Sequence, residues 1–105
     1  MRSEFRTYEY AIQFARECRK LEIPTDLRDQ LNRASASVAL NLKEGSSRHT
    51  QKDRHRFYRI SFGSFRECEA IFDIVEIKNE ALRNLANSLG GSLNRLCQAT
   101  RADER

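Results

Sequence analysis

The chain has 105 residues, which is enough for one domain and too few for two hydrophobic cores of ordinary size. Charged residues make up 32% and hydrophobic residues 39% of the chain, a composition that excludes most disordered proteins. One Pro and four Gly supply too few turns for an all-β domain, so an all-α fold is expected. The formal net charge is +4.

Two further classes of protein are disfavoured. No segment approaches the about 20 apolar residues that cross a bilayer, and the opening MRSEFRTYEY lacks the apolar stretch of a secretory signal, so a cytoplasmic location is expected. Cys18, Cys68 and Cys97 are odd in number, widely spaced and set among apolar residues, which predicts neither disulfides nor a metal half-site. We interpret them as reduced core residues and expect no metal and no cofactor.

Four amphipathic helices are predicted at about residues 4–21, 25–45, 48–77 and 79–99, within a single domain over residues 1–105. The inward face of the first helix is predicted to hold Tyr8, Ala11, Ile12 and Ala15. Tyr10 and Phe14 fall on another side of this helix, and Pro24 lies beyond its end.

The second helix is expected to begin at Thr25 or Asp26, with Gly45 as a left-handed cap after its last turn. Its narrow apolar stripe consists of Leu27, Leu31, Ala34, Val38 and Leu42.

Ser46, Ser47 or Thr50 is predicted to cap the third helix. Small residues on this helix should allow close approach to its neighbour. Its inward positions are predicted to be Phe57, Ser61, Ser64, Phe65, Cys68, Phe72 and Val75.

The fourth helix follows a turn at residues 78–80. Gly90 and Gly91 interrupt it and predict a kink or a close packing contact. Its stripe contains Leu82, Leu85, Ala86, Leu89, Leu93 and Leu96. Short connections between all four helices predict an up-down antiparallel four-helix bundle.

Some large apolar residues fall outside these stripes and are predicted to form a homo-oligomer interface. The alternative for any one of them is an ordinary exposed hydrophobic residue. The set consists of Tyr10, Phe14, Leu40, Phe62 and Ile77.

Positive charge is concentrated between residues 48 and 59, where five basic residues stand against Asp53 and account for the whole net charge. Cations near a helix N-terminus cost about 0.3–1 kcal/mol each at low salt, so stability alone does not explain them. A phosphate backbone would be bound there by side chains and helix end together, whereas the alternative is a solvated charged face. The candidate nucleic-acid-binding residues are Arg48, Lys52, His55, Arg56, Arg59 and Arg66.

Polar residues border the apolar stripe of the second helix. We interpret Arg33, Ser37, Asn41 and Glu44, with Glu67 opposite, as a structural network in which Arg33 pairs with Glu44 or Glu67, in preference to a catalytic site.

The segments DQLNRASASVALNLKEG, at 29–45, and FYRISFGSFRECE, at 57–69, resemble the family of four-helix-bundle proteins encoded by intervening sequences of large-subunit ribosomal RNA genes. The accessory variability proteins of diversity-generating retroelements are related to that family. The family pattern is approximately QLxRAxxSxxxNxxEG followed by GSxxE. The signature residues here are Gln30, Leu31, Arg33, Ala34, Ser37, Asn41, Glu44, Gly45, Gly63, Ser64 and Glu67.

The resemblance implies a left-handed antiparallel bundle that assembles into a ring-shaped homopentamer with a positively charged surface. In the retroelement branch, such a ring binds nucleic acid and a reverse transcriptase.

The expected function is therefore that of a non-enzymatic accessory protein that binds RNA or DNA by charge and shape, with a reverse transcriptase as a further partner. The alternative is a protein–protein scaffold without direct nucleic-acid binding. An RNA-cleaving enzyme is disfavoured because His49 and His55, its only conceivable acid–base pair, do not share a helix face.

Overall fold

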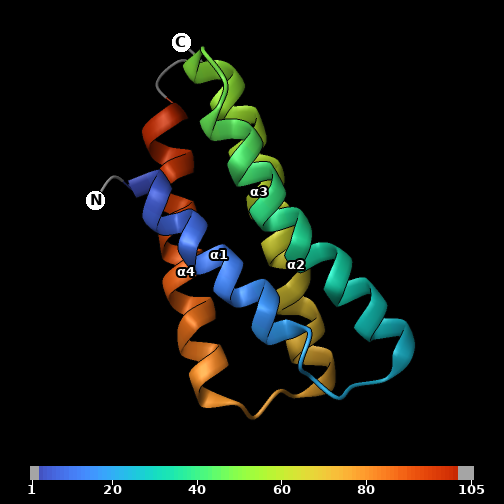
Figure 1. The fold of residues 1–105 in the computed structure, drawn as a ribbon. Coiled ribbons are helices and arrows are strands. Elements are labelled where there is room, and N and C mark those ends of the chain that lie inside the picture. Colours follow the sequence, from blue (N-terminus) through green and yellow to red (C-terminus); the bar gives the residue numbers. More distant parts are fainter. Residues whose placement is uncertain (1–2, 102–105) are drawn as a thin grey trace.

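The computed structural model describes residues 3–101, and within that range every regular element is helical. The helices are α1 (Ser3–Cys18), α2 (Thr25–Ser46), α3 (Gln51–Val75) and α4 (Glu80–Thr100). Each helix packs against the next and α4 packs against α1, so that the four enclose one core (Figure 1). The prediction of an all-α chain with four helices is confirmed. None of these helices is long and apolar enough to cross a membrane.

Local signals account for three of the helix ends. Thr50 begins α3 by accepting a hydrogen bond at its hydroxyl from the Asp53 backbone N–H, 3.1 Å away, and Asn79 caps α4 in the same way with Leu82. Both caps satisfy backbone donors that the first turn of a helix leaves unpaired. At the other end of α3, Glu76 adopts a left-handed conformation with φ 53° and stops the helix.

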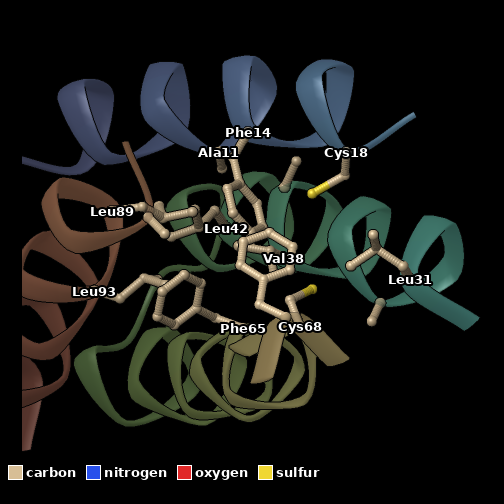
Figure 2. Close-up of a cluster of buried hydrophobic side chains, with 14 of the residues drawn as sticks. Ala11, Phe14, Cys18, Leu31, Val38, Leu42, Phe65, Cys68, Leu89 and Leu93 are labelled. Atoms are coloured by element: carbon tan, nitrogen blue, oxygen red, sulfur yellow. The ribbon is translucent and has the colours of Figure 1, made fainter. Parts of the chain in front are cut away.

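The core is built from one face of each helix (Figure 2). Phe14 of α1 lies between two rings of α3, with centroid distances of 5.6 Å to Phe65 and 5.7 Å to Phe72. The predicted stripes of α2 and α4 are largely confirmed, since Leu31, Ala34, Val38 and Leu42 are buried together with Leu82, Ala86, Leu89, Leu93 and Leu96. Leu27 and Leu85 are partly buried against the same core.

The buried face of α1 differs from the predicted one by a rotation about the helix axis. The structure buries Thr7, Ala11, Phe14 and Cys18, while Tyr8, Ile12 and Ala15 are only partly buried. A threonine can enter this core because its hydroxyl is satisfied there, by Ser92 Oγ of α4 and by the Ser3 carbonyl of its own helix.

The predicted face of α3 needs a similar correction at its start. Tyr58, rather than Phe57, is buried, and His55 is 5% exposed instead of facing solvent. His55 Nδ1 lies 2.9 Å from the Thr100 hydroxyl of α4, so a polar contact across the bundle supports its burial.

Gly45 was predicted to end α2 in a left-handed conformation, which is wrong. It lies inside the helix, and none of the glycines has a positive φ. Its role is close packing, because a Cβ at this position would lie 2.7 Å from Tyr58 Cε1. The close contact predicted at Gly90 is present, since a Cβ there would lie 2.8 Å from Phe65 Cε2.

All three cysteines are free and buried, as the sequence analysis predicted. Burial raises the pKa of the Cys18 thiol to about 12 and also raises the pKa values of Cys68 and Cys97. Thiols with pKa values this high carry little thiolate at neutral pH, so these cysteines act as small core residues.

Substitution of either close-packed glycine tests this account. Gly45→Ala and Gly90→Ala should each lower the free energy of unfolding by about 1–2 kcal/mol, because overpacking against a buried ring costs about 1–3 kcal/mol and offsets the better helix propensity of alanine. Urea unfolding followed by circular dichroism measures the change. An unchanged or raised urea midpoint for both variants would show that the rings of Tyr58 and Phe65 move aside at no cost in stability.

Candidate nucleic-acid interface

Four of the predicted binding residues form a line along the exposed face of α3, which we call the cationic ridge: Lys52, Arg56, Arg59 and Arg66. Spacings of four, three and seven residues place side chains on one face of a helix. At about 1.5 Å per residue, the ridge is about 21 Å long. All four residues are exposed, so the ridge is accessible along its whole length in the isolated subunit.

Little of the charge on the ridge is neutralised by other residues in the range 3–101. Arg66 Nε lies 3.1 Å from Glu69 Oε1 in an exposed pair. Among residues 3–101, no carboxylate lies within ion-pairing distance of Lys52, Arg56 or Arg59. Because an exposed pair contributes little stability, Arg66 can exchange Glu69 for another anion at low cost.

The ring of Phe57 positions two guanidinium groups at the N-terminal end of α3. The central carbons of Arg48 and Arg56 lie 4.7 Å and 4.6 Å from the ring centroid. Such cation–π contacts are worth about 0.5–1 kcal/mol at exposed sites, enough to restrict where a long side chain points. Phe57 therefore holds Arg56 in place without neutralising it.

Arg48 differs from the ridge residues. Its guanidinium pairs with Glu44 one turn earlier in the chain, as well as stacking on Phe57. Arg48 therefore ties the end of α2 to the start of α3, and its charge is balanced locally.

The two histidines differ in burial. His55, predicted to bind nucleic acid, is buried against Thr100 and does not lie on the exposed face of α3. His49 lies exposed in the connection between α2 and α3. The structure therefore does not bring the two imidazoles to one accessible site.

The five residues predicted to form an oligomer interface differ in how far they are exposed. Leu40 is 69% exposed on α2, as expected, but Phe14 is fully buried in the core and cannot form a subunit contact. Tyr10, Phe62 and Ile77 are partly buried and pack against the core of their own subunit.

Three exposed apolar residues were missed: Phe5, Ile60 and Ile74, which are 53%, 44% and 66% exposed. Ile60 and Ile74 belong to α3 and stand fourteen residues apart, a spacing that returns to the same helix face. At about 100° per residue, both isoleucines lie on the side of the helix away from the buried Phe65 and Phe72. Their exposure could therefore have been predicted from the sequence.

Some of the signature residues join α2 to α3. The Ser37 and Ser64 hydroxyl oxygens lie 2.8 Å apart, and the Asn41 side chain donates to the Ser37 carbonyl oxygen at 2.9 Å. Ser61 donates to the Val38 carbonyl oxygen at 2.8 Å. These contacts confirm that small polar residues line a close helix pair.

The expected pairing of Arg33 is not what the structure shows. Glu44 pairs with Arg48, and Glu67 accepts a hydrogen bond from Gln30 Nε2 at 3.0 Å. Arg33 is exposed on α2. The signature carboxylates are thus surface groups that link helix ends or neighbouring helices, and none of them is buried as an ion pair.

Comparison with curated proteins and with solved structures gave no match. A family model described as 23S rRNA-intervening sequence protein matches residues 3–101. The match spans all four helices and includes both signature segments and the cationic ridge. The chain therefore belongs to the 23S rRNA-intervening sequence protein family.

Proposed function

We propose that this chain is a non-enzymatic accessory protein that binds RNA or DNA through the cationic ridge of α3. The observation that carries the proposal is the ridge itself, in which Lys52, Arg56 and Arg59 are exposed and have no carboxylate partner among residues 3–101. A row of unneutralised cations attracts polyanions and releases their counterions on binding.

The proposed recognition depends on charge and shape. Lysine and arginine side chains on one helix face suit phosphate groups, which carry no sequence information. If the ridge contacts about four phosphates, log K should fall with log salt at a slope of about −3.6 for a duplex and about −2.8 for a single strand.

We also propose that the subunits form an up-down antiparallel bundle that assembles into a ring-shaped homopentamer in the cytoplasm. Exposed Leu40, Ile60 and Ile74 support self-association, because apolar residues of this size gain by burial in a partner. Several ridges on one assembly would bind a long polyanion together and more tightly than one ridge alone.

A protein scaffold is the second candidate, and the same exposed isoleucines favour it. They lie on α3, the helix that carries the ridge, so a protein partner with an apolar and acidic surface would fit there. A reverse transcriptase is the partner that the family resemblance adds to either function.

Neutralising the ridge tests the principal proposal. A Lys52→Gln, Arg56→Gln, Arg59→Gln variant should bind labelled RNA and DNA of one sequence far more weakly. Its salt slope should be smaller by about 2.7 for a duplex and by about 2.1 for a single strand. Fluorescence anisotropy over a series of KCl concentrations measures both quantities.

Arg16→Gln, Arg19→Gln, Arg28→Gln is the matched control, since it removes the same charge from exposed positions in α1, after α1 and in α2. It should retain most of the affinity of the unaltered protein. Equal binding by the ridge variant and the control would contradict the assignment of the ridge, and no binding by the unaltered protein at low salt would leave the scaffold as the better proposal.

Self-association is tested by mass. Light scattering should give a multiple of the 12.3 kDa subunit mass, five for the proposed pentamer. Leu40→Lys should reduce that mass without lowering the melting temperature, because this side chain is exposed in its own subunit. Gln98→Lys, at an exposed position of α4, is the control and should leave the mass unchanged. A monomer at all concentrations would contradict the proposal.

A further inference from the structure

Gly63 has no structural explanation within its own subunit. It lies in the interior of α3 at an exposed position, and a Cβ built there would meet nothing within 4 Å. Gly45 and Gly90, in contrast, are held against the buried rings of Tyr58 and Phe65. Glycine weakens a helix interior relative to alanine, so this subunit would be more stable with alanine at position 63.

The position of Gly63 on the ridge suggests what approaches it. Arg59 precedes it by four residues and Arg66 follows by three, and these spacings make all three residues neighbours on one helix face. Arg56 lies one turn further along the same face. The helix backbone at Gly63 is therefore bare of a side chain between Arg59 on one side and Arg66 on the other, and its remaining neighbours on this face are Ile60 and Glu67.

The two arginines beside Gly63 complement the charge of an anionic backbone. Arginine forks bind phosphate oxygens in a planar, bidentate way. Gly63 lies between Arg59 and Arg66 and has no Cβ, so a phosphate and its sugar can lie against the helix backbone at this position. Side chains pointing from that position would instead hold the strand away from the helix.

We propose that the sugar–phosphate backbone of a bound nucleic acid lies against α3 at Gly63, with phosphate groups held by Arg59 and Arg66. This inference rests on the proposed function and narrows it. The contact is made to the backbone at a fixed point of the ridge, and base identity plays no part in it.

Adding a side chain at this position separates binding from folding. Gly63→Ala and Gly63→Leu should melt at the same temperature as the unaltered protein or higher, since a Cβ at this exposed position meets nothing within 4 Å and both residues favour a helix. Their affinity for labelled RNA and DNA of one sequence should fall, by at least threefold for alanine and at least tenfold for leucine.

Ala81→Leu is the matched control, because it enlarges an exposed side chain on α4 and should leave the affinity unchanged. Binding by both Gly63 variants as tight as that of the unaltered protein would overturn this inference and leave the proposed function standing. Absence of binding by the unaltered protein would overturn both. A lower mass of the Gly63→Leu assembly in light scattering would overturn it in favour of a second copy of the chain packed at this point.

Discussion

The close contact between α2 and α3 is the constraint on which the rest of the molecule depends. Gly45 admits the ring of Tyr58, and Ser61 hydrogen-bonds to the Val38 carbonyl further along the same pair. The Ser37 and Ser64 hydroxyls meet on the flank of this contact. Small side chains allow two helix backbones to approach, and the hydrogen bonds fix the rotation of each helix as well as its distance.

The rotation of α3 decides which of its residues reach solvent. With Tyr58, Ser61 and Phe65 turned inward, the residues on the opposite side, Arg56, Arg59 and Gly63, are turned outward. A slip of one residue would bury a guanidinium group and expose a core ring, at a large cost in free energy. The packing of α2 therefore fixes the ridge, although none of the residues that fix it belongs to the ridge.

Much of this arrangement could be predicted from the sequence, and the errors have a common physical cause. The stripes of α2 and α4 were recognised because leucine, valine and alanine recur there at helical spacing. The faces of α1 and the start of α3 were misplaced because Thr7 and His55 are polar residues that enter the core. Their burial depends on Ser92 and Thr100 of α4, which are distant in sequence, and single-helix periodicity contains no information about such partners.

The same limitation explains the errors at the candidate site. Arg48 and His55 were predicted to bind nucleic acid together with the ridge residues, but Arg48 is paired with Glu44 and His55 faces α4. Spacing alone could not separate cations that bind within the subunit from cations that remain available. The sequence could not show either that Gly63 differs from Gly45 and Gly90. Only the structure shows that the space beside Gly63 is empty, whereas buried rings lie beside the other two glycines.

The cations near the start of α3 differ in the contacts that they make. Asp53 and the Thr50 cap suit the positive end of the helix dipole, whereas Lys52 and Arg54 in the first turn oppose it. Arg48 offsets its cost by joining Glu44 and Phe57, and Arg56 gains from the same ring. Lys52 has no comparable contact among residues 3–101, so the stability of the helix does not explain its position in the first turn.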